Sequence, residues 1–545
     1  MKQIIKHIWM LIAILCTSTS ATAYDFEVDG IAYTITSLTD LTVCVDHLTK
    51  KDTTKINIPE NVEYKSKKLT VTSLNKGAFT NNNTLSEVIL PNTITSIGDE
   101  AFYNCINLKN INLNSNLKSI GDKAFYNCIN LRNINFNSNL KSIGIEAFAK
   151  SGLISIEIPT SISFLGDGAF KMTRIKKISL PDNIRKIPNY CFQECRQLQY
   201  VMSSSSLSRI ESHAFENCIL LKHISLPELS YIGEYAFSGC AKLEEFTLSA
   251  YKLEPSILWN CPRLTKLTIG SHTSELPHKK RYWVYGEGLT EETLGYCFEH
   301  SMEHCNSWCK GYAHLTGIKR FIIEDSDKPF SIKTFVRGHL NEAGAEMAPF
   351  SNLNLNYYYV GRPLKDITKW TDYYGNERTT DTRQGTGKIK KLEIGGYCTE
   401  VPYFYQAMDT LKLGAKIKRF ELENLYKFDI VKIECLATTP PECTGYSTSD
   451  FPTNVYTDAI LYVPYGSKEA YAKAEVWKNF WNIYELENND SGVTTIKSDQ
   501  GDSKYCVYSL TGILIGKSYS MEDVHNLPKG IYILINGSKR FKIKI

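Results

Sequence analysis

A unit of 22 or 23 residues recurs along this chain, and the repeat constrains the fold more than any other feature. The stretch AFYNCINLKNINLNSNLKSIGDK begins at Ala101, and the stretch AFYNCINLRNINFNSNLKSIGIE follows it at Ala124 with four changes. A phenylalanine marks the same point of eight copies: Phe79, Phe102, Phe125, Phe148, Phe170, Phe192, Phe215 and Phe237. A fixed period in this range indicates stacked repeats that lengthen along one axis, so 545 residues need not form several globular domains.

The aligned copies share L-x-x-I-x-L, a short gap containing Pro or Asn, I-x-x-I-G, two or three residues, A-F, and a Cys three residues after the Phe. The first piece alternates near its end, which predicts a short strand with Ile and Leu pointing inward. The second piece predicts another extended segment, and it ends on a glycine in five copies: Gly98, Gly121, Gly144, Gly166 and Gly233. We expect these glycines to supply a backbone angle that other residues resist. One unit cannot bury its apolar face, but its neighbours can cover it.

The first 23 residues are typical of an export signal. Two lysines precede an apolar core at residues 8–16, and the small-x-small pattern ATA at 21–23 follows before Tyr24. The core is too short to cross a bilayer, and no other segment approaches about 18 uninterrupted apolar residues, so we expect no transmembrane helix. Lipid attachment at Cys16 is the alternative to simple cleavage, although Leu15 stands where such sites usually carry a small residue.

The charge balance does not point to a particular class of partner. Lys and Arg number 62 against 58 Asp and Glu, a net charge of +4 that becomes +2 when the two lysines of residues 1–23 are removed. An excess this small gives no argument for a nucleic-acid or membrane-surface partner.

Six cysteines occupy one position of the repeat: Cys105, Cys128, Cys195, Cys218, Cys240 and Cys261. Ser151 and Thr173 fill the same position in the two intervening copies. A column of small residues predicts packing inside the coil, with buried thiols. Disulfides between successive copies are the alternative, and each would need suitable geometry.

The consensus I-x-x-I-G-x-x-A-F-x-x-C-x-x-L-x-x-I-x-L-P resembles that of the BspA-type leucine-rich repeat proteins, which are exported and surface-displayed proteins of bacteria. The resemblance is strong over residues 68–269, and residues 435–486 are similar to the way arrays of that family end. It implies a leucine-rich repeat solenoid with short parallel strands on each face. It also implies an adhesin or surface-binding role, since host-matrix and polysaccharide contacts are associated with the group.

The chain is expected to divide into seven segments. These are a signal peptide at 1–23, an N-terminal β cap at 24–67, regular leucine-rich repeats at 68–270, degenerate repeats with inserted loops at 271–434, a terminal repeat or cap at 435–486, a linker at 487–504 and a small C-terminal β-module at 505–545. A separate domain within 271–386 is the alternative where the period is lost. The linker is polar and lacks apolar periodicity, so we expect it to be flexible.

The C-terminal module is similar to the sorting domains of proteins exported by the type IX route. The similarity rests on VYSLTG, LPKGIYI and a basic, strand-like end. Several short strands are expected, with turns at residues 511–512, 529–530 and 536–537. The alternative is a small β-module without a sorting role.

One cluster contains metal-binding residue types: Cys297, His300, His304, Cys305 and Cys309. The spacing of four within the His pair and within the last Cys pair would place each pair on one face of a helix, which suits tetrahedral Zn²⁺. However, no C-x-x-C pair is present there, and Cys297-Phe298 also matches the A-F step of a degenerate repeat. We therefore expect no metal and no cofactor.

Catalytic motifs are missing from the sequence. It contains no G-x-S-x-G elbow, no H-E-x-x-H and no phosphate-binding glycine loop. A pair of glycosidase carboxylates assembled from distant loops stays open as an alternative. Because the motifs are missing, we expect no enzyme activity and no catalytic residues.

The residues that flank the central position of L-x-x-I-x-L should point outward from the strand and form a long, mostly polar strip. These candidate binding residues are Asn110, Asn112, Asn133, Asn135, Ser155, Glu157, Lys177, Ser179, Tyr200, Met202, His223, Ser225, Glu245 and Thr247. Side chains repeated in this way can hydrogen-bond a partner. The alternative is that they are simply solvated strand residues.

A second candidate binding surface is aromatic and lies in the segment where the period is lost. Its members are Tyr282, Trp283, Tyr285, Tyr357, Tyr358, Tyr359, Trp370, Tyr373 and Tyr374. Exposed aromatic residues in polar loops suit sugar or protein contacts. Burial beneath the inserted loops is the alternative.

These features predict an exported protein at the cell surface, on the outer-membrane exterior, that binds an extracellular protein or glycan. A carbohydrate-active enzyme or accessory sugar-binding protein, with the aromatic segment as its sugar site, is the first alternative. A purely structural surface-layer component is the second.

Overall fold

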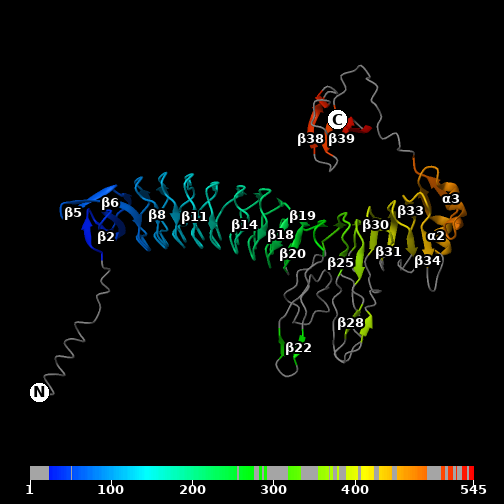
Figure 1. Ribbon diagram of the computed structural model, residues 1–545, viewed down its shortest axis with the longest axis horizontal. Helices are drawn as coiled ribbons and strands as arrows, with labels where there is room; N and C mark the ends of the chain where they lie inside the picture. The colour runs from blue at the N-terminus through cyan, green and yellow to red at the C-terminus, as the bar shows by residue number, and fades with distance from the viewer. Residues whose placement is uncertain are drawn as a thin grey trace.

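The structure is a computed structural model in which the repeats stack along one axis (Figure 1). It describes residues 24–254 apart from 51, and 257–274, 282–284, 288–290, 317–332, 354–366, 369–371, 377–379, 388–402, 407–422, 429–444, 451–487, 505–509, 514–519, 523–524, 531–536 and 539–544. The predicted signal peptide and almost all of the predicted linker lie outside these ranges. Within them, no helix has both the length and the apolar character needed to cross a membrane.

The N-terminal end of the stack is built from β1 (Phe26–Val28), β2 (Ile31–Ser37), β3 (Thr42–Leu48), β5 (Asn61–Tyr64) and β6 (Lys67–Leu74). Strand β2 pairs antiparallel with β1 and β3, and β5 pairs antiparallel with β6. Strand β6 pairs in parallel with β3 and with β8 (Ser96–Ile97), a short I-x-x-I-G strand of the repeats. These N-terminal strands therefore continue the sheet of the repeats and occupy its first edge.

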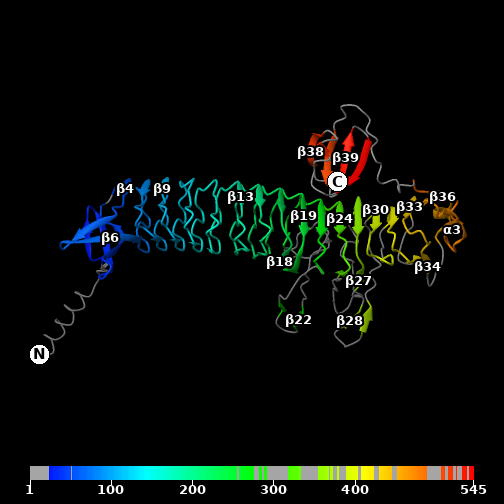
Figure 2. The ribbon, with the colours of Figure 1, turned by 45° about the horizontal axis from the view of Figure 1, so that its top comes forward.

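Each regular repeat contributes two short extended segments, which build two faces of the stack (Figure 2). The first face comprises the L-x-x-I-x-L strands β4 (Lys55–Asn57), β7 (Glu87–Ile89), β9 (Asn110–Asn112), β13 (Lys177–Ser179), β15 (Tyr200–Met202), β17 (His223–Ser225), β19 (Glu245–Leu248) and β21 (Lys266–Ile269). The second face comprises the I-x-x-I-G strands β8, β10 (Ser119–Ile120), β11 (Ser142–Ile143), β12 (Phe164–Leu165), β14 (Lys186–Ile187), β16 (Arg209–Ile210), β18 (Leu229–Ile232) and β20 (Ala250–Leu253). Paired strands within each face are parallel.

The first face continues into the region where the sequence period is lost. One nine-stranded parallel sheet contains β19, β21, β24 (Arg320–Ile323), β26 (Tyr357–Val360), β30 (Lys388–Ile394), β31 (Ala407–Leu413), β33 (Lys432–Cys435), β35 (Ile460–Val463) and β36 (Asn482–Glu485). Its strands alternate buried and less buried residues, as in the regular repeats.

The remaining elements are not part of this nine-stranded sheet. Two antiparallel hairpins are formed by β22 (Tyr282–Val284) with β23 (Gly288–Thr290) and by β28 (Lys369–Thr371) with β29 (Glu377–Thr379). Two parallel pairs join β25 (Phe330–Ile332) to β27 (Leu364–Asp366) and β32 (Arg419–Glu421) to β34 (Glu442–Thr444). Helices α2 (Thr453–Asp458), α3 (Lys468–Lys473) and η2 (Trp477–Asn479) follow. A separate antiparallel sheet has the order β38 (Leu514–Tyr519), β37 (Tyr505–Ser509), β39 (Ile531–Asn536), β40 (Lys539–Lys544).

The repeated phenylalanines form a stacked ladder in the core, as the period predicts. The rings of Phe102 and Phe125 are 5.0 Å apart and 9° from parallel, and both side chains are fully buried. The ladder continues to Phe170 and Phe192, whose rings are 5.8 Å apart. Because each ring packs on the ring before and after it, the apolar interior is shared between neighbouring coils.

The prediction for the glycines of I-x-x-I-G is wrong. Among the glycines that the structure describes, positive φ occurs at Gly30, Gly77, Gly168, Gly239 and Gly466, and none of these closes that motif. A Cβ added to Gly144 would lie 2.5 Å from the carbonyl carbon of Gly121, and one added to Gly166 would lie 2.4 Å from that of Gly144. Glycine is needed here because successive coils approach closely, not because of its backbone angle.

The left-handed backbone lies at two other positions of the repeat. One precedes the A-F step and the other follows the Phe by two residues: Glu100 and Asn104, Lys123 and Asn127, Glu146 and Lys150, Gly168 and Met172, Tyr190 and Glu194, His213 and Asn217, and Tyr235 and Gly239. Their φ angles lie between 50° and 70°. Asn and Gly tolerate this region best, and they fill several of these positions.

The column of cysteines packs inside the coil as thiols, as expected. The six repeat cysteines are buried and unpaired. The Sγ of Cys128 donates to the carbonyl oxygen of Phe102 at 3.1 Å, and the Sγ of Cys218 donates to that of Phe192 at 3.2 Å. Burial raises the pKa of the Cys105 thiol to about 12, so the thiol stays protonated and unreactive at neutral pH.

Candidate binding surfaces

The predicted strip lies on the first face with its side chains in solvent. In β9, β13 and β15 the central residue is buried and both flanking residues are exposed. The exposed members are those predicted: Asn110, Asn112, Asn133, Asn135, Ser155, Glu157, Lys177, Ser179, Tyr200, Met202, His223, Ser225, Glu245 and Thr247. Where strands pair, members stand opposite one another, as Lys177 does to Tyr200 and Tyr200 to His223. The strip therefore presents two columns with a step of about 4.8 Å per coil.

The strip is divided into three sheets. Strands β4, β7 and β9 form the first, β13, β15 and β17 form the second, and the nine-stranded sheet begins at β19. Residues 133–135 and 155–157, between the first two sheets, are in no strand. In the middle sheet Tyr200 is 51% exposed and Met202 is 59% exposed. One coil in the middle of the strip therefore exposes two large, mostly apolar side chains, and the neighbouring coils on either side expose polar ones.

The sequence analysis missed the C-terminal half of the first face, where the outward columns form a polar cluster. Tyr357 Oη donates to Glu393 Oε2 at 3.1 Å, and Lys412 Nζ donates to Glu393 Oε1 at 2.6 Å. Lys391 Nζ lies 3.4 Å from the same carboxylate. The available signal was the alternating fragment IKKLEIGG, whose outward residues include both Lys391 and Glu393.

Glu393→Gln tests this cluster. Burial alone would raise the pKa of the Glu393 carboxyl, but the hydrogen bond and charge of Lys412, with the charge of Lys391, hold the pKa below its ordinary value of 4.5. A depressed carboxyl pKa stabilises the folded state above the unfolded pKa, and this stabilisation is lost as the pH falls through the folded value. We expect the variant to be less stable by about 1–3 kcal/mol at neutral pH, with the difference closing in acid.

Urea unfolding of both proteins between about pH 7 and pH 3 measures this difference. Asp409→Asn is the matched control, because Asp409 pairs with the exposed Lys388 at 2.6 Å and such a pair contributes little. A difference for Glu393→Gln that stays the same in acid would contradict the assignment.

The candidate aromatic residues do not form one exposed surface. Tyr358 is 2% exposed and its ring packs 5.2 Å from that of Phe321, because alternation along β26 turns it inward. This corrects its prediction as a contact residue. Three further candidates lie in the hairpin strands β22 and β28, namely Tyr282, Trp283 and Trp370. Tyr357 and Tyr359 lie half-buried on the other side of β26, where Tyr357 Oη donates to Glu393 at 3.1 Å and Tyr359 Oη donates to Asp325 at 2.8 Å. The last three candidates lie outside the described residues, namely Tyr285, Tyr373 and Tyr374.

The candidate metal ligands also lie outside the described residues: Cys297, His300, His304, Cys305 and Cys309. Within the described part of the chain, no group of three or more His, Cys, Asp or Glu residues is placed to hold a metal ion.

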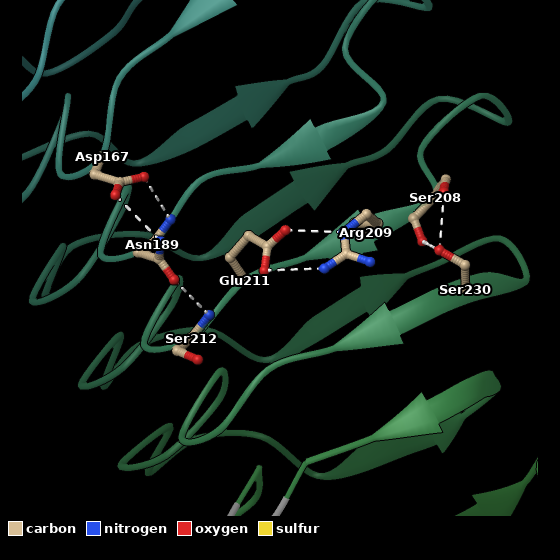
Figure 3. A network of polar contacts seen from close by, with 7 residues as sticks. All are labelled: Asp167, Asn189, Ser208, Arg209, Glu211, Ser212 and Ser230. Carbon is tan, nitrogen blue, oxygen red and sulfur yellow. Dashed lines mark hydrogen bonds and ion pairs between the residues drawn. The ribbon is translucent and has the colours of Figure 1, made fainter.

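The turns at the end of the second-face strands are joined by side-chain hydrogen bonds (Figure 3). The backbone N–H and the side-chain amide of Asn189 donate to the two carboxylate oxygens of Asp167, both at 3.1 Å. The backbone N–H of Ser212 then donates to Asn189 Oδ1 at 3.1 Å. Each polar side chain therefore satisfies the backbone of the next coil, which fixes the spacing of the turns.

The strands of the second face carry a separate set of contacts (Figure 3). Arg209 donates through Nε and Nη2 to the carboxylate of Glu211, at 2.9 Å and 3.4 Å. The hydroxyls of Ser208 and Ser230 lie 3.0 Å apart, and Ser230 Oγ donates to the carbonyl oxygen of Ser208 at 2.9 Å. The serine side chains therefore hydrogen-bond to each other and to the backbone of the sheet, whereas the Arg209 side chain is exposed at its surface.

The regular part of both faces falls within the part of the chain that matches a known family model. Residues 49–174 and 163–280 match the BspA type leucine-rich repeat region, in 6 copies. These residues are BspA-type leucine-rich repeats. The BspA-type repeats include every strand of both faces from β4 to β21. The matching model describes a repeat region and names no enzyme.

Several solved structures of leucine-rich repeat proteins are similar to this chain. A protein of Bacteroides ovatus is 23% identical over 75% of this chain and 100% of its own, with a TM-score of 0.44. The pneumococcal vaccine antigen PcpA is 17% identical over 68% of this chain and 94% of its own, with a TM-score of 0.35. A cell surface protein of Faecalibacterium prausnitzii is 19% identical over 48% of this chain and 92% of its own, with a TM-score of 0.26. Among curated proteins, none matches this chain.

Proposed function

We propose that this protein is an exported cell-surface solenoid that binds an extracellular protein along the first-face strip. The observation that carries the proposal is the pattern of exposure along the strip. Its middle holds Tyr200 and Met202, which are 51% and 59% exposed, while Asn110 and Asn112 lie toward one end and Glu245 toward the other. A pair of exposed apolar side chains surrounded by polar ones is the arrangement expected of a protein–protein interface.

The proposed location rests on the two ends of the sequence. Residues 1–23 have the three parts of an export signal. Residues 505–545 are similar to type IX sorting domains, and four antiparallel strands lie in that segment. Together they support display on the exterior of the outer membrane. The proposal needs no catalytic residue and no cofactor.

An array of purified extracellular-matrix proteins tests the proposal. We expect the wild-type protein to bind at least one of them. Replacing Tyr200 and Met202 together with serine should weaken that binding at least about tenfold, because anchors at the centre of an interface carry most of its energy.

The matched control replaces Ile129 and Ile219 together with serine. These residues are 43% and 39% exposed and lie in turns away from the strip, so the same number of exposed apolar side chains is lost. Binding by the control should stay close to wild type. The proposal fails if no matrix protein binds, or if both double variants bind as well as wild type.

A further inference from the structure

The second face carries a row of positive charge that the proposed function does not use. Two residues of each second-face segment lie between its inward apolar residues. Over nine coils these pairs are Thr72 and Ser73, Thr95 and Ser96, Lys118 and Ser119, Lys141 and Ser142, Ser163 and Phe164, Arg185 and Lys186, Ser208 and Arg209, Ser230 and Tyr231, and Tyr251 and Lys252, and none of them is buried. We call this set the second-face track. Six of its members are Lys or Arg and none is Asp or Glu.

Four cations of the track have no ion pair with any residue that the structure describes: Lys118, Lys141, Arg185 and Lys186. The other two are already neutralised, Arg209 by Glu211 at 2.9 Å and Lys252 by Glu254 at 2.7 Å. The four unpaired cations are exposed and lie on the third, fourth and sixth of the nine coils of the track. Their charge is therefore available to a ligand.

Three aspartates that border the track, Asp99, Asp122 and Asp167, accept hydrogen bonds from backbone N–H groups. Asp99 Oδ1 accepts a hydrogen bond from the backbone N–H of Asp122 at 2.9 Å, and Asp122 Oδ1 accepts one from that of Ile145 at 2.7 Å. Asp167 receives two hydrogen bonds from Asn189 (Figure 3). These three carboxylates hold the turns together and form no ion pair with the four unpaired cations.

The hydroxyl side chains keep the track flat. Ser163 Oγ donates to the carbonyl oxygen of Lys141 at 3.2 Å, and Thr95 Oγ1 donates to that of Thr72 at 3.3 Å. Ser230 makes the same contact to Ser208 (Figure 3). Each hydroxyl hydrogen-bonds to the backbone of the preceding coil. A long ligand can therefore follow the axis of the stack without meeting a bulky side chain at these positions.

Two aromatic rings stand in solvent among the cations. Phe164 is 53% exposed and Tyr251 is 63% exposed. A third ring, that of Tyr231, is covered by the Arg209 guanidinium at 4.3 Å and by Lys252 Nζ at 5.3 Å. Phe164 and Tyr251 therefore leave apolar ring surface available beside positive charge, and the apolar face of a sugar ring packs well on such a surface.

We propose that the second-face track binds a linear acidic polysaccharide lengthwise. Lys118, Lys141, Arg185 and Lys186 pair with its carboxylate or sulfate groups, and Phe164 packs against the face of a sugar ring. A polymer with a charge on each repeating unit meets cations at intervals of whole coils, about 4.8 Å each. From Lys118 to Lys252 the track spans six coil steps, roughly 29 Å.

The charge pattern distinguishes this track from the first-face strip. The strip holds Glu157 and Glu245 among its outward residues, whereas the track holds no acid. The residues of the track itself therefore offer a polyanion no like charge, whereas those of the strip offer two. The proposal therefore concerns a different surface and a different partner from the proposed function, and either can fail without the other.

Biolayer interferometry with immobilised heparin and polygalacturonate tests the proposal, with neutral dextran as the uncharged polymer. We expect the wild-type protein to bind both acidic polymers and not dextran. Changing Lys118, Lys141, Arg185 and Lys186 together to glutamine should weaken this binding at least about tenfold. Changing Phe164 and Tyr251 together to alanine should weaken it about three- to tenfold, which a simple ion exchanger would not show.

The matched control changes four exposed first-face cations to glutamine: Lys109, Arg132, Lys176 and Lys222. It removes the same charge, so we expect binding within about twofold of wild type. Thermal melts of all variants verify folding. Equal loss in both quadruple variants, absence of binding to both acidic polymers, or binding confined to phosphatidylglycerol vesicles would each overturn the proposal.

Discussion

Phe148→Ala is expected to lower the free energy of unfolding by about 3–5 kcal/mol and to leave a cavity in the core. The ring is fully buried, with that of Phe125 at 5.0 Å on one side and that of Phe170 at 5.8 Å on the other. The ring of Phe136 contacts it edge-on at 5.6 Å. Removing one ring therefore strips contacts from two neighbouring coils as well as from its own.

Urea unfolding and hydrogen exchange measure this effect. Each coil contacts only its neighbours, so exchange should rise most in residues 124–170 and least at the distant end of the array. Phe164→Ala is the control, because its ring is 53% exposed and its loss should change stability by no more than about 0.5 kcal/mol. A cost below about 1 kcal/mol for Phe148→Ala would show that the ladder does not hold the coils together.

Gly144→Ala is expected to destabilise the array by about 1–3 kcal/mol or more, although it adds a single methyl group. The added Cβ would lie 2.5 Å from the carbonyl carbon of Gly121, and backbone atoms cannot move aside as a flexible side chain can. The two coils would have to separate, which also lengthens the hydrogen bond from Gly144 N to Ile120 O, now 2.9 Å.

Gly168→Asn is the contrasting control for this prediction. Gly168 has a φ of 64°, and the equivalent residues Lys123 and Glu146 adopt 52° and 50° with side chains present. Asparagine tolerates this conformation and restricts the unfolded chain, so we expect little loss or a small gain in the urea midpoint. If Gly168→Asn proved the more damaging change, the role assigned to the glycine at the end of I-x-x-I-G would be wrong.

The repeat and its core were predictable from the sequence because the same 22- or 23-residue period marks the repeat and the apolar positions that form its core. Phe102 and Phe125 occupy equivalent positions, so the stacking of their rings follows once the coils are stacked. The same logic placed Cys105 and Cys128 inside. The reason why glycine is required at Gly144 could not be predicted from the sequence. A glycine that makes room for a neighbouring backbone and a glycine with a left-handed φ angle look the same in a sequence. Only the placement of adjacent coils separates the two.

The candidate surfaces were predictable in part. Alternation along L-x-x-I-x-L was enough to place Tyr200 and Met202 outward. In the Tyr-rich segment the composition suggested an exposed loop, but the same alternation operates in β26 and buries Tyr358. The second-face track was missed because the Ile residues of I-x-x-I define the core, while the two residues between them vary. The row of positive charge that these residues form becomes visible only when the nine coils are aligned.

The near-identity of residues 101–123 and 124–146 has a consequence for how such arrays change. The two units present the same contacts before and behind, so a gene that lost one of them or copied it again would encode coils that still fit. Both outer surfaces would then shorten or lengthen by one step without a change of pattern. The length of surface that contacts a partner can therefore change during evolution by whole repeats, without a substitution in any repeat.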